Sequence, residues 1–250
     1  MKSNSEAIAL FNEMAKLNKY NSDNFYFSSG RPVKIDPKII VEDIDSKLEL
    51  KKNDLLLDVG CGTGVITLPI SKKVNKIFAL DGGFNVIEQL KKNIINNKII
   101  NINKINIPFD KNNFEDNFFD KVLMYAVIHY LDGDKYVKNC IEELIRICKP
   151  GGKILIAEIP EKNAIENLRN GLLTNKEKQI INNFEKNRNE YDQFMKQFDV
   201  NKYQFNYLEM EQDKLKEICK DFGCEAQILK QDIRQPFSLT RRDLLIKLPS

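Results

Sequence analysis

The chain has 250 residues, of which 42% are hydrophobic and 30% charged, proportions typical of a globular protein with one sizeable core. Its 39 basic and 36 acidic residues leave a net charge of +3, so the charge balance gives no reason to expect nucleic acid as a partner. No apolar run is long enough to cross a bilayer and the first residues lack a signal-peptide core, so we expect a cytoplasmic protein without a membrane partner.

The first fifty residues predict two helices and a connecting aromatic loop. Residues 3–18 form an amphipathic pattern that begins at a capping box, and Asp36 followed by a proline begins a second helix that runs to about Leu48. The loop between them carries Tyr26 and Arg31, and loops of this length inside compact chains tend to be functional or disordered. Both side chains are therefore candidate substrate contacts. The open alternative is that the aromatic rings anchor the loop in the core.

Residues 55–64, LLLDVGCGTG, predict a buried strand that ends on a tight glycine turn. A helix is predicted next, over 65–71. A dinucleotide-binding loop needs a third glycine where this chain has Val65. Asp58 stands two residues before the first glycine, where a carboxylate would repel a phosphate and attract a cation. S-adenosylmethionine carries a sulfonium and an ammonium group and no phosphate, so it suits this loop better than a dinucleotide.

The second and third strands follow, and an acid stands at the end of the second. Residues 76–80 predict a strand that ends at Asp81, and 82–93 predict a helix. A lone acid after a strand is usually a helix cap. Beside Asp58 and the glycines, however, we expect Asp81 to bind a ribose. Residues 99–105 predict a weaker third strand.

The fourth strand is predicted over 121–124 and ends at Tyr125. His129, the only histidine of the chain, follows four residues later. Because an imidazole titrates near neutral pH, we predict that His129 is a general base, with Tyr125 beside it. The alternatives are that His129 packs beside a substrate pocket or caps the helix predicted over 134–148.

The fifth strand is predicted over 153–160 and leads into a helical insertion. Glu158 lies near the carboxyl end of this strand, where it would touch an acceptor substrate or simply face solvent. Residues 161–204 are polar with helical periodicity, which predicts a helical insertion between the fifth and sixth strands.

The last part of the chain predicts a helix over 211–222 and strands over 225–230 and 243–248. Arg241 and Arg242 stand just before the final strand. Paired arginines suit bidentate binding of a phosphate or carboxylate, so Arg241 is a candidate substrate contact. The alternative is ordinary surface charge.

The motif LDVGCGTG with Asp81 after the next strand, and the later run KPGGKILI, resembles the class I S-adenosylmethionine-dependent methyltransferases over 53–160. The resemblance implies that the glycine loop holds the methionine part of the cofactor and that Asp81 accepts hydrogen bonds from both ribose hydroxyls. The product would be S-adenosylhomocysteine. The cofactor-binding residues implied here are Asp58, Gly60, Cys61, Gly62, Gly64, Asp81, Gly82, Ile107 and Tyr125.

The family's acid beside the adenine has no clear counterpart in this chain. Asn103, Asn106 and Asp110 are the nearest candidates, and backbone groups with Ile107 and Phe109 are the alternative.

The residues after the fourth strand, MYAVIHYL, restrict the acceptor. The run lacks the N-P-P-Y turn of amino-group enzymes, the Pro-Cys of cytosine C5 enzymes and the clustered acids of magnesium-dependent ones. The five cysteines, without a C-x-x-C pair, give no disulfide framework or metal site. We predict a small-molecule acceptor, an oxygen of a sugar, nucleotide-linked or phosphate-bearing and hence anionic metabolite, and no nucleic acid.

Three other functions stay open: N-methylation of a small amine, non-catalytic binding of S-adenosylmethionine, and a nicotinamide-dependent oxidoreductase on a related sheet.

The fold implied is α/β, a Rossmann-like doubly wound sheet of about seven strands with the last strand antiparallel. We expect one domain over 1–250, made of a helical lid over 1–50, a cofactor-binding core over 51–160, a helical cap over 161–205 and a completion of the core over 206–250.

Overall fold

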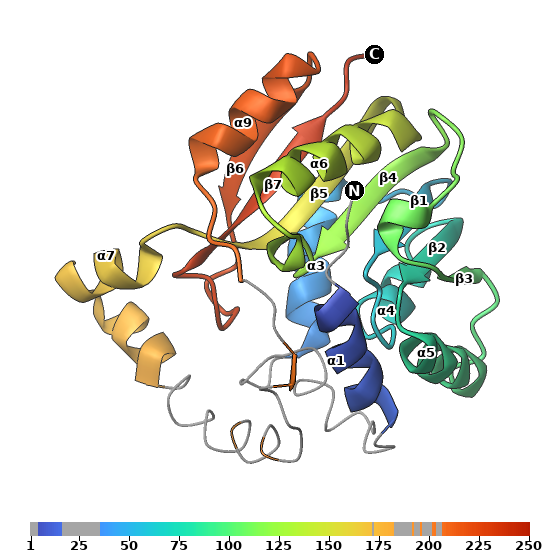
Figure 1. Cartoon of the computed structure of the whole chain (residues 1–250), viewed down its shortest axis with the longest axis horizontal. Coiled ribbons are helices and arrows are strands. Elements are labelled where there is room, and N and C mark those ends of the chain that lie inside the picture. Colours follow the sequence, from blue (N-terminus) through green and yellow to red (C-terminus); the bar gives the residue numbers. More distant parts are fainter. Residues whose placement is uncertain are drawn as a thin grey trace.

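The computed structural model describes residues 5–16, 36–171, 173–182, 192, 196, 202–203 and 207–250. Within these residues, seven strands form one sheet in the order β3-β2-β1-β4-β5-β7-β6 (Figure 1). The strands are β1 (Leu55–Val59), β2 (Lys76–Asp81), β3 (Ile102–Asn106), β4 (Phe119–Tyr125), β5 (Cys148–Pro160), β6 (Glu225–Lys230) and β7 (Arg241–Lys247). Strands β1 to β5 pair in parallel, whereas β7 pairs antiparallel with both β5 and β6. The predicted doubly wound sheet with an antiparallel last strand is confirmed.

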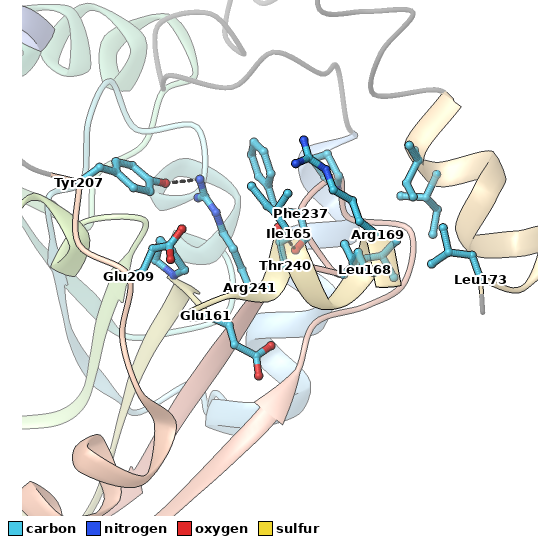
Figure 2. Close-up of a pocket in the computed structure, with 16 residues that line it drawn as sticks. Glu161, Ile165, Leu168, Arg169, Leu173, Tyr207, Glu209, Phe237, Thr240 and Arg241 are labelled. Atoms are coloured by element: carbon cyan, nitrogen blue, oxygen red, sulfur yellow. Dashed lines mark hydrogen bonds between the residues drawn. The ribbon is translucent and has the colours of Figure 1, made fainter. Parts of the chain in front are cut away.

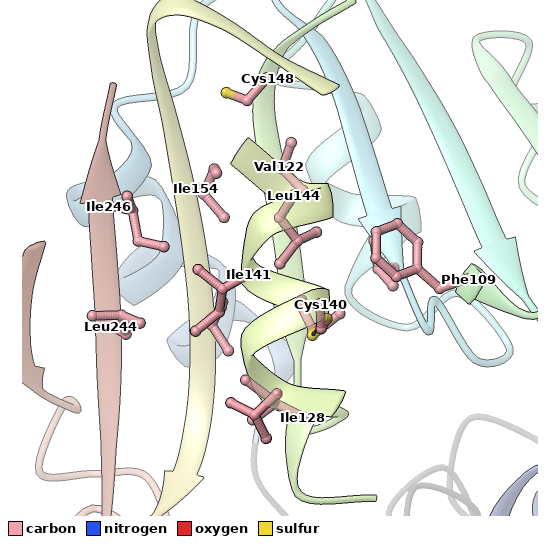
Figure 3. Close-up of a cluster of buried hydrophobic side chains, with 14 of the residues drawn as sticks. Phe109, Val122, Ile128, Cys140, Ile141, Leu144, Cys148, Ile154, Leu244 and Ile246 are labelled. Carbon is pink, nitrogen blue, oxygen red and sulfur yellow. Dashed lines mark hydrogen bonds between the residues drawn. The ribbon is translucent and has the colours of Figure 1, made fainter. Parts of the chain in front are cut away.

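Helices cover both faces of the sheet. The helices are α3 (Pro37–Leu48), α4 (Thr67–Ser71), α5 (Phe84–Asn96), α6 (Asp134–Ile147) and α9 (Gln212–Asp221). Helices α6 and α9 bury apolar side chains on one face, and α3, α4 and α5 do so on the other. In α6, Val137, Ile141 and Leu144 recur at helical spacing and form one apolar stripe in the core. Figure 3 shows Ile141 and Leu144 of this stripe beside the strands.

Helix α3 begins where the sequence predicts it. The Asp36 carboxylate accepts a hydrogen bond from the amide of Lys38 at 2.9 Å, and Pro37 occupies the first helical position. This cap sets the start of α3, which brings polar side chains of the same helix to the edge of the sheet described below.

The start of β5 differs from the prediction. The strand begins at Cys148 and includes Pro150, although the sequence indicated a helix stop there and a strand only from Lys153. The pairing of β4 with β5 shifts register between Phe119 and Lys121, so the missing amide hydrogen of the proline interrupts no regular ladder.

Two helical elements lie outside the sheet and its covering layers. Helix α1 (Ser5–Lys16) packs against α5, and α7 (Ala164–Asn170) follows β5, with a further helical stretch over 175–182. Tyr26 and Arg31, the predicted lid contacts, lie outside the described residues. The division of the chain into lid, core and cap stays a prediction. In the described part of the chain, no helix combines the length and the apolar character needed to cross a membrane.

Candidate cofactor and acceptor site

The glycine loop after β1 has a backbone that only glycine adopts without strain. Gly60, Gly62 and Gly64 have φ angles of 72°, 55° and 92°. A Cβ placed on Gly60 would lie 2.3 Å from Cγ2 of Val127. The amide of Gly60 donates to the carbonyl of Leu80 at 2.8 Å, so the loop folds over the end of β2. At Gly62, in contrast, a Cβ would meet no atom within 4 Å, which leaves open space on the inner side of the loop.

Asp81 uses one carboxylate oxygen for this loop and the other for the turn that follows β2. Oδ2 accepts the amide of Gly62 at 3.1 Å, and Oδ1 accepts the amide of Gly83 at 2.9 Å. Burial raises the pKa of Asp81, and these two hydrogen bonds oppose the rise. Each oxygen of an ionised carboxylate has two lone pairs, so Asp81 can accept further hydrogen bonds from a diol.

Asp58 lies buried at the end of β1. The hydroxyl of Thr67 donates to Asp58 Oδ2 at 2.6 Å. Burial raises the pKa of Asp58 from 3.8 to about 6; the hydrogen bond from Thr67 opposes the rise and the charge of Asp81 adds to it. Cys61 is buried beside these acids, and burial raises the pKa of its thiol well above the usual range. The end of β1 and the glycine loop thus hold a buried carboxyl group and an inert thiol close to Asp81, which suits a cationic ligand better than a phosphate.

Helix α1 covers the residue that follows Asp81. A Cβ on Gly82 would lie 2.8 Å from Cδ1 of Ile8 in α1. The side-chain oxygen of Asn12 accepts the amide of Asn85 at 2.7 Å, and the Asn12 carbonyl accepts Nδ2 of Asn85 at 3.3 Å. The first helix thus lies beside the predicted ribose site and is fastened to the start of α5.

The adenine candidates lie in different places. Asn103 lies in the middle of β3, away from its carboxyl end, and Nδ2 of Asn106 donates to the Asp81 carbonyl at 3.0 Å. Phe109 is buried in the core cluster under α6 (Figure 3), with Ile107 half-buried against it. Asp110 is half-buried in the short helix η2 (Phe109–Lys111). Asn103 therefore lies away from the strand ends where the adenine is predicted to bind. The adenine contact of Ile107 stays a prediction.

The ends of β4 and β5 have unusual backbone. Ala126 and Glu158 have φ angles of 58° and 59°, a region that residues with a Cβ rarely adopt and that is common at functional sites. The two positions are adjacent, because the amide of Ala126 donates to the carbonyl of Ala157 at 3.0 Å. Glu158 lies where the pairing of β5 with β7 shifts register. The hydroxyl of Tyr125, the residue before Ala126, donates to Gln235 Oε1 at 2.9 Å and lies 3.2 Å from Glu158 Oε1.

A buried chain of polar groups surrounds Glu158, which has no exposed surface. Arg241 Nη1 donates to Glu158 Oε2 at 2.7 Å, and the Glu158 amide donates to Asp243 Oδ1 at 2.9 Å. Lys47 Nζ donates to Asp243 at 2.7 Å and to Asp43 at 2.6 Å. The predicted alternative of a solvated Glu158 is wrong, because the side chain is enclosed by these partners.

The sequence did not identify the other members of this chain of polar groups. Gln235 Nε2 donates to Asp43 Oδ2 at 2.7 Å across 192 residues of sequence. The only local signal was the spacing of Asp43 and Lys47, which places them on one face of α3. The second predicted arginine, Arg242, pairs instead with Glu161 at 2.9 Å.

His129 is enclosed by aromatic rings in the short helix η3 (Ile128–Tyr130). Its ring centre lies 4.3 Å from that of Tyr130 and 4.5 Å from that of Tyr207, and the side chain is 1% exposed. Phe11 of α1 packs edge-on against Tyr130 at 5.5 Å. This arrangement agrees with the predicted alternative in which His129 packs beside a pocket, and its role as a base stays a prediction.

A cavity of about 550 Å³ lies between α7, the helical stretch 175–182 and the start of β7 (Figure 2). Tyr207 and Arg241 form one wall, and α7 forms the opposite wall. The guanidinium of Arg241 stacks on Phe237, with 4.0 Å from its central carbon to the ring centre, and also donates to the Tyr207 hydroxyl. Tyr207, Phe237 and the cavity itself were not anticipated from the sequence, which shows no pattern linking these segments.

Comparison with known proteins identifies the core. Residues 57–156 match the family described as "Methyltransferase domain". A 23S rRNA uracil C5-methyltransferase of Pasteurella multocida is 35% identical over 81 residues, 31% of this chain and 18% of the relative. A probable ribosomal RNA small subunit methyltransferase A of Methanosphaera stadtmanae is 32% identical over 108 residues, 43% of this chain and 36% of the relative. A demethylmenaquinone methyltransferase of a Geobacillus strain is 27% identical over 133 residues, 50% of this chain and 53% of the relative.

These curated relatives are matched over at most about half of their length. Two of them are named as RNA methyltransferases. The prediction that nucleic acid is not a partner is therefore wrong, because relatives of this chain are named as acting on RNA. Net charge was a poor guide, because a local groove rather than the whole-chain balance determines contact with RNA.

Solved structures share the whole fold. Magnesium protoporphyrin IX methyltransferase from Synechocystis, with bound S-adenosylhomocysteine, has a TM-score of 0.62 at 11% identity and covers 98% of this chain and 95% of its own. Phosphoethanolamine N-methyltransferase 1 of Haemonchus contortus, with phosphoethanolamine and S-adenosylhomocysteine, has a TM-score of 0.63 at 14% identity, over 100% of this chain and 50% of its own. The resemblance stated from the sequence is confirmed, and so is its cofactor, S-adenosylmethionine.

Proposed function

Because the core of this chain belongs to the class I S-adenosylmethionine-dependent methyltransferases, we propose that the protein transfers a methyl group from S-adenosylmethionine to a small-molecule acceptor. One observation carries the proposal: two buried carboxylates, Asp58 and Asp81, lie at the ends of neighbouring strands around a glycine loop with open space at Gly62. That hollow suits a cation with a ribose and repels the pyrophosphate of a nicotinamide cofactor.

The chain's own residues would divide the binding among them. Asp58 would attract the ammonium group and Asp81 would accept the ribose hydroxyls, while the loop from Gly60 to Gly64 would contact the methionine part through its backbone. Ile8 of α1, which lies over Gly82, would limit access of water to the ribose. We propose that α1 belongs to the lid predicted over 1–50.

Catalysis by this chain would consist mainly of positioning. The bound cofactor supplies a methyl group already activated by its sulfonium, so the protein needs to hold the acceptor in line with it. If the acceptor is a hydroxyl, its proton must leave as the new carbon–oxygen bond forms. His129 lies near the end of β4 and is our proposed proton acceptor. Tyr125, the last residue of β4, is held through its hydroxyl by Glu158 and Gln235.

The nature of the acceptor is a separate part of the proposal. We propose methyl transfer to oxygen, as expected from the missing amino-group motif after β4. A sugar or phosphate-bearing acceptor, also predicted from the sequence, stays a prediction that the apolar walls of the cavity do not favour. The alternative of a small amine keeps support from the phosphoethanolamine enzyme of similar fold.

Calorimetry with the purified chain tests cofactor binding. We expect S-adenosylmethionine and S-adenosylhomocysteine to bind and NAD to give no heat. Asp81→Asn should weaken binding at least about tenfold, because the amide loses one acceptor oxygen and about 1.4 kcal/mol. Asp213→Asn, on the exposed side of α9, is the matched control and should bind normally. Binding of NAD without S-adenosylmethionine would overturn the proposed function.

A labelling assay tests the acceptor class. The chain is incubated with methyl-labelled S-adenosylmethionine and, in separate arms, a small-molecule extract and ribosomal RNA. We expect label in the small-molecule fraction. Label in the RNA arm without label in the extract would refute a small-molecule acceptor while leaving methyl transfer intact.

A further inference from the structure

We propose that the cavity beside Arg241 is the acceptor site, and that its acceptor is an uncharged, mostly apolar molecule with one oxygen-bearing end. This inference rests on the proposed function and adds the chemical class of the substrate. It follows from the lining of the cavity, from the pairing of its charges and from its connection to the end of β4.

The lining favours an apolar body. Ile165 and Leu168 of α7 line the cavity close to Phe237 (Figure 2), and Leu239 adds to the apolar lining. Ile165 is 55% exposed in the structure, which is a large apolar surface left uncovered. The cavity volume of about 550 Å³ lies in the range of sites for small ligands, about 300 to 1,000 Å³. A molecule of that size would cover the exposed apolar side chains of α7.

The charges at the cavity argue against an ionised acceptor. Arg241 is paired with Glu158 at 2.7 Å, and Glu161 is paired with Arg242 at 2.9 Å. Arg169 of α7 and Glu209 also line the cavity, so two basic and two acidic side chains line it and their charges balance. A buried anion would therefore face carboxylates as well as guanidinium groups. An unpaired charge is costly to bury, whereas a neutral hydroxyl or carbonyl needs only one hydrogen bond.

Arg241 can supply that hydrogen bond. A guanidinium has five N–H donors. Among the described residues, the side chain donates through Nη1 to Glu158 and through Nη2 to Tyr207, and its central carbon lies 4.0 Å from the ring centre of Phe237. Donors thus remain for a neutral oxygen at the polar end of the cavity.

The polar end of the cavity adjoins the proposed reaction site. Tyr207 lines the cavity and its ring centre lies 4.5 Å from that of His129. On the other side, Arg241 connects through Glu158 to the Tyr125 hydroxyl. An acceptor whose oxygen lies near Arg241 would therefore have that oxygen close to the end of β4, where class I folds place their ligands.

The test uses two fluorescent probes of nearly equal shape. N-phenyl-1-naphthylamine is neutral, and 1-anilinonaphthalene-8-sulfonate adds one sulfonate to the same skeleton. Both are titrated into the intact chain. We expect the neutral probe to bind in a one-to-one ratio and at least about tenfold more tightly than the anionic probe, because the sulfonate would lose its hydration and would face the carboxylates of Glu161 and Glu209 as well as the guanidinium groups.

Two variants of α7 locate the probe. Leu168→Asn replaces an apolar wall residue and should weaken binding of the neutral probe about tenfold. Asn167→Ala lies on the same helix but does not line the cavity, so it should leave the affinity unchanged. Circular dichroism of both variants reports whether the helices are retained, and the comparison of the two probes on the unaltered chain does not depend on either variant.

Each outcome decides the inference. Absence of neutral-probe binding, equal binding by Leu168→Asn, or tighter binding of the anionic probe would overturn it. Calorimetry with S-adenosylmethionine on the same sample separates it from the proposed function: cofactor binding without probe binding refutes only the acceptor class, and probe binding without cofactor binding refutes only methyl transfer.

Discussion

The hydroxyl of Thr67 lies 2.6 Å from a carboxylate oxygen of Asp58, and both side chains are buried under the glycine loop. Asp58 keeps a pKa of about 6 despite this hydrogen bond. A carboxyl group whose pKa lies this close to neutrality should couple ligand binding to pH.

We expect the affinity for S-adenosylmethionine to fall about tenfold per pH unit below pH 6, because a proton and a cation compete for Asp58. Thr67→Val removes the hydrogen bond that lowers the pKa, so the fall should begin at a higher pH. Asp58→Asn should bind weakly and without this pH dependence. Calorimetry from pH 5 to pH 8 measures all three, and a flat wild-type profile would contradict the role of Asp58.

The Asp58 carboxyl group should make the fold less stable as the pH rises, whereas it should make cofactor binding tighter. Since the pKa of Asp58 is raised on folding, the stabilisation from its bound proton is complete below about pH 3.8 and is lost as pH rises through about 6. At neutral pH the ionised form costs about 3 kcal/mol. Asp58→Asn should therefore raise the free energy of unfolding at pH 7.5 and have little effect near pH 4, as measured in urea.

Gly64→Ala should destabilise the fold more than Gly223→Ala. Both positions have positive φ, 92° and 70°, but a Cβ on Gly64 would lie 2.3 Å from Leu90, which is buried, whereas one on Gly223 would meet nothing within 4 Å. We expect a loss of about 3 kcal/mol at Gly64 from strain and overpacking, and about 1 kcal/mol at Gly223 from strain alone. Urea unfolding of both variants tests this, and equal losses would show that Leu90 moves aside.

The pair of Glu158 and Arg241 should show strong coupling in a double-mutant cycle. Glu158 is fully buried, so Arg241→Met would leave its charge without the 2.7 Å partner and cost about 3 kcal/mol. Glu158→Gln combined with Arg241→Met should recover most of that loss. The exposed pair of Asp213 and Lys216 is the control, with coupling below about 0.5 kcal/mol. Additive effects at Glu158 and Arg241 would mean that the other polar groups hold Glu158 without the arginine.

His129→Gln should separate binding from catalysis. If His129 accepts the acceptor's proton, the variant should bind S-adenosylmethionine normally and lower kcat at least about a hundredfold. The rate should also lose its dependence on pH near neutrality, a change that a packing role between Tyr130 and Tyr207 would not produce. The assay uses the acceptor found by labelling. Full activity across pH would contradict the assignment.

Loosening α1 should speed the release of cofactor. Asn12→Ala removes the hydrogen bond from Asn12 Oδ1 to the Asn85 amide and should raise the dissociation rate of S-adenosylmethionine about fivefold. Lys16→Ala changes an exposed residue at the end of the same helix and serves as the control. Stopped-flow measurements decide, and identical rates would show that α1 is not part of a lid.

Much of the candidate cofactor site was predictable because its residues lie close together in the sequence. The apolar run 55–59, three glycines and Asp58 lie within ten residues, and Asp81 ends the next strand. Since parallel strands present their carboxyl ends at one edge, these residues had to meet once the alternation of strands and helices was recognised. The order of elements followed from the same periodicity, with errors only at boundaries such as the start of β5.

Only the tertiary structure determined which residues surround the proposed acceptor site. Gln235 and Asp43 are separated by 192 residues, and Tyr207 reaches His129 from a segment with no distinguishing pattern. Whether Glu158 is solvated or enclosed depends on β7 running antiparallel beside β5, which places Arg241 and Asp243 next to it. Sequence periodicity shows which side of an element is apolar, but contacts between distant segments arise only when the whole chain packs, and it is packing that formed the apolar cavity and paired its charges.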